Sequence, residues 1–142
     1  MGRFFKQALL VAVVAAALGA LAVSGPAAQR TFDASNCSNA AYKPQRIVLA
    51  CADAGFMAVE MVWSRWGKKQ ANGTGTGRVE ICKPDCAAGH FAKSQIQLRL
   101  FRARHCSQDD RRHFTKVEFV WRHGVPGGGP KRGTVPLPCS LL

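Results

Sequence analysis

Residues 95–102 read QIQLRLFR, and apolar side chains alternate with polar ones along this stretch. Successive side chains of an extended chain point to opposite faces of a sheet, so three consecutive positions of one face are aliphatic: Ile96, Leu98 and Leu100. The other face carries two glutamines and an arginine. This pattern is typical of a β-strand with one face in the core and the other in water.

Four further segments have strand-like patterns and are separated by turn residues: 46–53, 56–66, 78–82 and 114–121. In the last of them we expect Val117, Phe119 and Trp121 to point inward. In the second, strict alternation gives one buried face: Met57, Val59, Met61 and Trp63. The Gly-rich and polar residues 67–77 are interpreted as a flexible connection. The sequence therefore predicts a mostly β fold, a small antiparallel sandwich or open barrel of about five strands.

Residues 1–28 have the features of a secretory signal peptide. A positive start with Arg3 and Lys6 precedes an apolar run, residues 9–23, and a small-residue exit. The alternative is a membrane anchor, but this run of about 15 residues is shorter than the roughly 20 that span a bilayer. We expect cleavage to leave a single secreted domain, 29–142, with an irregular Pro- and Gly-rich C-terminal tail and no transmembrane segment.

All six cysteines lie beyond the signal peptide: Cys37, Cys51, Cys82, Cys86, Cys106 and Cys139. An even number in an exported chain favours three disulfides, which would staple a domain of only about 114 residues. An up-and-down order of strands favours three pairs, with other pairings left open: Cys51–Cys82, Cys106–Cys139 and, by elimination, Cys37–Cys86.

Two close cysteines in the stretch CKPDCAAGHF, residues 82–91, suggest a metal site, a redox site or a pinned turn. Structural zinc sites usually combine two such pairs, but here the second pair is missing and the histidines are scattered. A thioredoxin-like site has two residues between its cysteines, whereas three lie here. We interpret the stretch as a disulfide-pinned connection and expect neither a metal nor a cofactor.

Four motifs occur in order along the domain: IVLACAD at 47–53, WSRW at 63–66, CKPDCAAGHF at 82–91 and HFTKVEF at 113–119. In this combination the chain resembles a family of small secreted proteins from high-GC Gram-positive bacteria, over about residues 44–120. The family has no established activity, so the resemblance implies bacterial export and a common fold and supplies no catalytic residues. The chain departs from the family at RVEI, residues 78–81, where polar residues are usual.

Charge is the strongest functional signal. Without the signal peptide, 18 basic residues stand against eight acidic ones, a formal net charge of +10. Such a protein attracts anions, and we expect anionic envelope polymers or an acidic protein as partners, but no specific nucleic acid. The candidate binding residues are Arg102, Arg104, Arg111 and Arg112, around the last predicted link, together with Trp66 as an exposed aromatic contact. The alternative is that the charge only maintains solubility.

No signature of catalysis brings the candidate nucleophiles, acids and histidines together. The GTGTG stretch at 73–77 lacks the Gly-Lys-Ser/Thr that completes a phosphate-binding loop, and no nucleophile elbow is present. The sequence therefore favours a binding or surface-interaction module, secreted or associated with the cell envelope, over an enzyme. Two alternatives stay open: a small secreted hydrolase whose residues meet only in the fold, and an inhibitor of a secreted enzyme.

Overall fold

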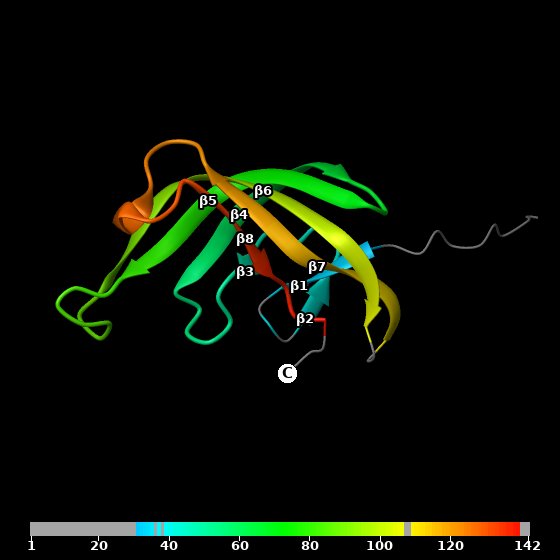
Figure 1. Ribbon diagram of the computed structural model, residues 1–142, viewed down its shortest axis with the longest axis horizontal. Coiled ribbons are helices and arrows are strands. Elements are labelled where there is room, and N and C mark those ends of the chain that lie inside the picture. The colour runs from blue at the N-terminus through cyan, green and yellow to red at the C-terminus, as the bar shows by residue number, and fades with distance from the viewer. Residues whose placement is uncertain (1–30, 36, 38, 107–108, 140–142) are drawn as a thin grey trace, which may run out of the picture.

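The computed structural model describes residues 31–35, 37, 39–106 and 109–139, and their regular secondary structure is almost entirely strand (Figure 1). The strands are β1 (Thr31–Ser35), β2 (Asn39–Ala41), β3 (Ile47–Val48), β4 (Phe56–Trp66), β5 (Gln70–Ile81), β6 (His90–Cys106), β7 (Asp109–Trp121) and β8 (Arg132–Pro136). One turn of 3-10 helix, η1 (Pro126–Gly128), precedes β8. The mostly β fold class is confirmed.

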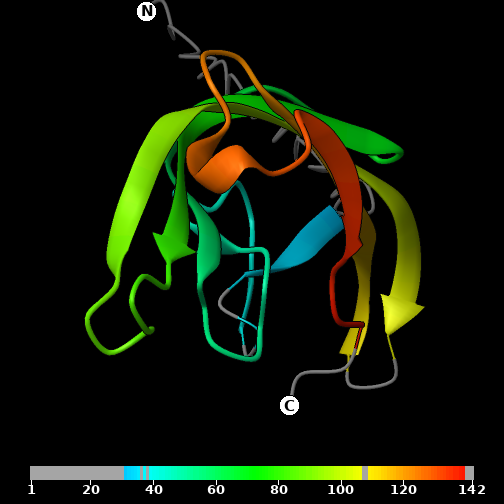
Figure 2. The same cartoon turned by 60° about the vertical axis from the view of Figure 1, so that its left-hand side comes forward.

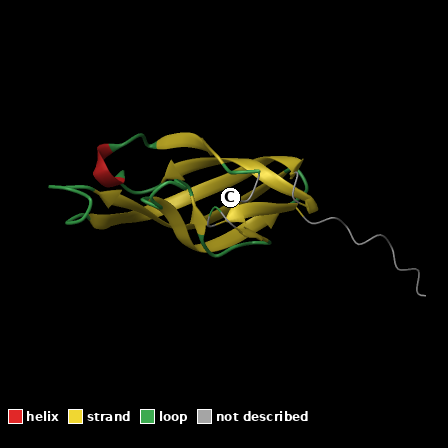
Figure 3. Cartoon of the chain, turned by 90° about the horizontal axis from the view of Figure 1, so that it is seen from below, coloured by secondary structure: helices red, strands yellow, loops and turns green. Residues whose placement is uncertain are grey.

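The strands form one curled sheet in the order β2-β1-β7-β6-β5-β4-β3, and β8 pairs with β7 beside this path. Neighbouring strands are antiparallel except β1 and β7, which run parallel. The sheet curls into a half-barrel whose open side holds η1 and the chain around it (Figure 2). Seen from below, the long strands run along the length of the molecule (Figure 3). This is the open-barrel form of the prediction.

The core lies on the concave face of β6 and β7, as the alternation predicts. Ile96, Leu98 and Leu100 have no exposed surface, and Trp121 is only 3% exposed. The register pairs Leu98 with Phe119 across the two strands, so the inward residues of both meet on one face. Burial of each such side chain contributes about 1.5–3 kcal/mol, which makes this strand pair the centre of the fold.

The Gly-rich stretch 67–77 is not a connection for most of its length, because β5 begins at Gln70. Its inward positions are glycines: Gly73, Gly75 and Gly77. A Cβ at Gly75 would lie 2.6 Å from the Met61 sulfur, and one at Gly77 would overlap the Trp121 ring. Large neighbours therefore fill the space that these glycines leave. Glycine, usually a loop signal, here lets bulky side chains pack onto the strand backbone.

The strict alternation predicted for β4 is wrong because the strand contains two bulges. Its register with β5 shifts at 59–62 and again at 63–65, and Glu60 has a φ of 55°. Each extra residue reverses which side chains point inward. Met57 is buried as expected, at 7% exposure, but it and Val59 lie outside the core cluster. The β4 residues that belong to the cluster or pack against it are Phe56, Ala58, Met61, Trp63 and Trp66.

The disulfide pairing was predicted correctly for one bridge of three. The bonds are Cys37–Cys51, Cys82–Cys86 and Cys106–Cys139, so the expected Cys51–Cys82 and Cys37–Cys86 pairs are wrong. The prediction treated 46–53 as a full strand, but β3 has only two residues, and β1 and β2 were not foreseen. The interpretation of the Cys82–Cys86 stretch as a pinned connection is confirmed.

The bridge between Cys37 and Cys51 connects the two ends of the sheet path. Cys37 lies between β1 and β2, and Cys51 follows β3. The C-terminal tail is more regular than expected, because β8 pairs with residues 116–120 of β7. No helix in the part of the chain that the structure describes is long and apolar enough to cross a membrane, and the expected signal peptide lies outside that part.

Candidate functional site

The four candidate arginines lie on the far part of the β6–β7 ribbon. The predicted link is shorter than expected, since β6 runs to Cys106 and β7 begins at Asp109. The register pairs Arg104 with His113 and His105 with Arg112, so the arginines are close neighbours across the ribbon. The ribbon brings them to one end of the molecule, as the hairpin prediction required.

The four arginines differ in their surroundings. Arg102, Arg104 and Arg111 are exposed, whereas Arg112 is half-buried and its Nη2 donates a hydrogen bond to the Ala103 carbonyl at 2.9 Å. Arg102 has a φ of 54°, and its carbonyl accepts a hydrogen bond from the Thr115 hydroxyl at 2.8 Å. Arg112 therefore supports the ribbon, and the exposed arginines are the ones that a ligand can reach.

A second basic group lies at the same end of the sheet. Lys68 and Lys69 lie in the turn between β4 and β5, and Arg65 lies near the end of β4. All three are exposed. Because Gln70 pairs with Phe101, this turn lies beside the start of the arginine-bearing part of β6. The β4–β5 turn and the tip of the β6–β7 ribbon share one end of the molecule (Figure 1).

We call this region the basic end: Arg65, Lys68, Lys69, Arg102, Arg104, Arg111 and Arg112. Three acidic residues stand on strands at the same end: Asp33, Asp109 and Asp110. Seven basic against three acidic residues leave a formal charge of +4 there. The sequence shows the two basic groups as separate clusters, and only the strand register reveals that they adjoin.

Trp66 is not an exposed contact. It is partly buried, packs against the core, and makes edge-to-face contacts with Trp63, Tyr42 and Phe114, with ring centroids 4.7, 5.5 and 5.6 Å away. Tyr42 is the more exposed ring, at 40%, and the Lys43 Nζ lies 5.5 Å from its centroid. The second bulge in β4 turns Trp66 inward, which alternation alone does not predict.

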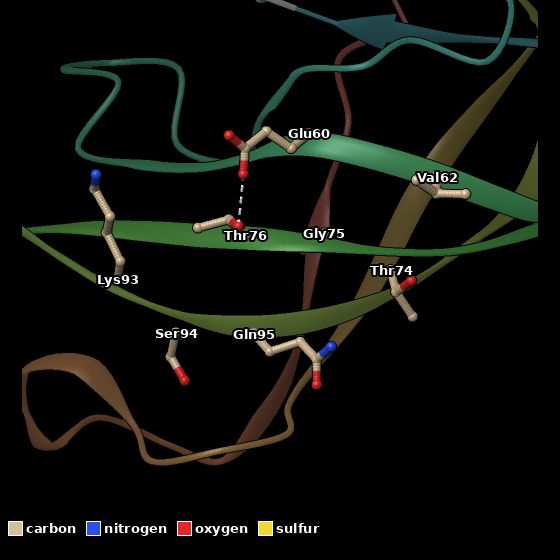
Figure 4. A pocket seen from close by; sticks show the side chains of 8 residues that line it. All are labelled: Glu60, Val62, Thr74, Gly75, Thr76, Lys93, Ser94 and Gln95. Atoms are coloured by element: carbon tan, nitrogen blue, oxygen red, sulfur yellow. Dashed lines mark hydrogen bonds between the residues drawn. The ribbon is translucent and has the colours of Figure 1, made fainter.

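A polar groove of about 450 Å³ crosses the outer face of β4, β5 and β6 (Figure 4). The Thr76 hydroxyl donates to the Glu60 carboxylate at 2.9 Å, and the Ser94 hydroxyl donates to the His123 carbonyl. The lining residues include one carboxylate, that of Glu60, and no histidine, and the Thr76–Glu60 hydrogen bond is exposed. Among the described residues, no three His, Cys, Asp or Glu side chains are close enough to bind a metal ion.

Comparisons of this chain with protein-family models, with curated proteins and with solved structures find no match. The resemblance to small secreted proteins of high-GC Gram-positive bacteria therefore stays a prediction.

Proposed function

We propose that this chain is an exported binding module whose basic end binds an anionic, phosphate-linked polymer of the cell envelope. The observation that carries the proposal is the pairing of Gln70 with Phe101, which joins two basic groups into one surface. Three disulfides support an oxidising, extracellular setting. Bacterial origin and secretion belong to the same proposal.

Electrostatics favours a polymer over a single small anion. The exposed basic side chains extend from the β4–β5 turn across to the β6–β7 ribbon, so a flexible polyanion can contact several of them at once. Each contact releases condensed counterions, and this release makes the affinity fall steeply as salt rises. Because these cations are spread over an open surface of strands and a turn, they suit a repeating ligand better than one small anion.

Two variants with equal charge loss test the proposal. The first removes four exposed cations of the basic end, Lys68→Gln, Lys69→Gln, Arg102→Gln and Arg104→Gln. The matched control removes four exposed cations elsewhere, Lys83→Gln, Lys93→Gln, Lys131→Gln and Arg132→Gln. Arg112 is kept in both, because its hydrogen bond to Ala103 supports the ribbon.

The probe is poly(glycerol phosphate), and calorimetric titrations at several salt concentrations give the affinity and its salt dependence. We expect the basic-end variant to bind at least about tenfold more weakly near physiological salt, with a log–log salt slope smaller by up to about 3. The control should stay within about threefold of the parent, because only non-specific attraction is reduced.

Equal loss in the two variants would show that overall charge, and not the basic end, causes binding. If the parent protein does not bind the polymer at near-physiological salt, the proposal is overturned. The positive charge would then serve only to keep the protein soluble. If the parent instead retains an acidic protein through the same four residues, the surface is correct but the partner class is wrong.

A further inference from the structure

An apolar cavity of about 200 Å³ lies inside the half-barrel at the end opposite the basic end. Phe56 at the start of β4, Val79 near the end of β5, and Phe119 and Trp121 near the end of β7 form its sheet side. The connection between β7 and β8 covers the other side, and Figure 2 shows that connection folded into the open side of the sheet.

The aromatic walls of the cavity are held in place by one another. Phe56 stacks on Trp121 with ring centroids 5.8 Å apart, and it meets Phe119 edge to face at 5.1 Å. Phe119 and Trp121 are at most 7% exposed, so the surrounding core fixes their positions. Apolar cavities of about 150 Å³ take up benzene. This cavity is large enough for one six-membered ring. Such a ring can stack on one aromatic side chain of the wall and meet another edge to face.

The connection over the cavity is fixed at its two ends and rich in glycine between them. The Trp121 amide donates to the Lys131 carbonyl at 2.9 Å, and the Ser94 hydroxyl donates to the His123 carbonyl. Between these anchors lie four glycines, of which three have positive φ: Gly124, Gly127 and Gly128. Glycine can adopt a wider range of backbone conformations than other residues can. The four glycines therefore give the connection more backbone freedom than other residues at these positions would.

The mouth of the cavity adjoins one basic residue. Val125 and Pro126 of the connection are half-buried, whereas Gly129 and Pro130 are exposed, so the cavity opens beside Pro130. The exposed Lys131 follows directly in the chain and lies opposite Trp121 in the pairing of β7 with the chain before β8, whereas Arg132 pairs with Val120 on the other face of the sheet. None of the residues that line the cavity is charged. A substituent that leaves the ring at the mouth thus enters a region that favours negative charge.

We infer that this cavity binds a small monocyclic aromatic carboxylate, with the ring against Phe56 and Trp121 and the carboxylate at the mouth beside Lys131. The aromatic walls select the ring, the volume limits it to one, and the Lys131 ammonium group favours a carboxylate over an ammonium group. The site is separate from the basic end and does not depend on polymer binding.

Three probes of similar size test the inference on the full chain: benzoate, toluene and benzylamine. We expect saturable NMR shifts of the Val79 and Val125 methyl groups, the two aliphatic probes of the lining. Benzoate should bind about threefold more tightly than benzylamine, since one exposed cation contributes a modest charge preference. Lys131→Gln should remove this preference and leave toluene binding unchanged, whereas Arg132→Gln, on the other face of the sheet, should leave the preference in place.

Filling and enlarging the cavity supply the structural controls. Val125→Phe should abolish binding of all three probes, whereas Val62→Phe, the same change at a site 70% exposed on the outer face, should not. Should Val125→Phe fail to fold, Phe119→Leu enlarges the cavity and should admit 2-naphthoate, which the parent rejects. Absence of saturable benzoate shifts, or unchanged binding in folded Val125→Phe protein, would overturn the site. A benzoate preference that survives Lys131→Gln would overturn the carboxylate assignment.

Discussion

At the scale of single residues, three glycines of β5 leave no space for a side chain: Gly73, Gly75 and Gly77. Gly75 of β5 lies opposite the bulge in β4 that contains Glu60. That bulge brings the carbonyl oxygen of Val59 within 2.6 Å of the position where a Cβ of residue 75 would lie. Backbone cannot move aside as a flexible side chain can. The glycine is therefore required by the bulged partner strand and not by a turn.

We expect Gly75→Ala to destabilise the protein by about 1–3 kcal/mol, because the added methyl group overpacks the interface between β4 and β5. Gly129→Ala is the control. No heavy atom lies within 4 Å of a Cβ built there, and the φ of −75° suits alanine, so its stability should change by less than about 1 kcal/mol. Denaturant unfolding measures both values. A cost at Gly129 as large as at Gly75 would contradict the packing argument.

At the scale of elements, β7 has an inward face and an outward face that mutation can separate. Trp121 is 3% exposed in the core, so Trp121→Ala should cost about 3–5 kcal/mol. Lys116 lies on the opposite face and pairs with Phe101 and Pro136, so Lys116→Ala should change stability by about 0.5 kcal/mol or less. Denaturant unfolding tests this, and similar costs for the two variants would mean that the face assignment is wrong.

The elements that alternation predicts well are the regular ones. In β6 and β7 the period of two continues without a break from Ile96 to Leu100, and the inward residues follow directly from it. In β4 the two bulges depend on contacts with β5, which one strand's own sequence does not reveal. In β5 the inward positions are glycines, so the strand lacks the alternating apolar residues that would have identified it. Side chains of other strands fill the space above these glycines. The basic end was missed as one surface for the same reason: it depends on the β5–β6 register.

At the scale of the whole molecule, the disulfides differ in how much of the fold they connect. Cys82–Cys86 closes a short connection, with a sequence separation of 4, whereas Cys37–Cys51 spans 14 residues and joins the two ends of the sheet path. Cys106–Cys139 spans 33 residues and ties the tail to the ribbon tip. In the chain-entropy account, a bridge stabilises more as its closed loop lengthens. The three bridges should therefore rank by sequence separation.

We expect the double Cys→Ser variants to lose stability in the order Cys106–Cys139, then Cys37–Cys51, then Cys82–Cys86. The loop-length difference alone separates the last two by about 1 kcal/mol. Both cysteines of a bridge are replaced together, so that no unpaired thiol can exchange with another bridge. Thiol titration of the denatured, unreduced parent should find no free thiol, and denaturant unfolding of the variants then gives the order. If loss of Cys82–Cys86 costs the most, local constraint of the exposed connection contributes more to stability than closure of the half-barrel, and the Cys37–Cys51 bridge is not what holds the sheet ends together.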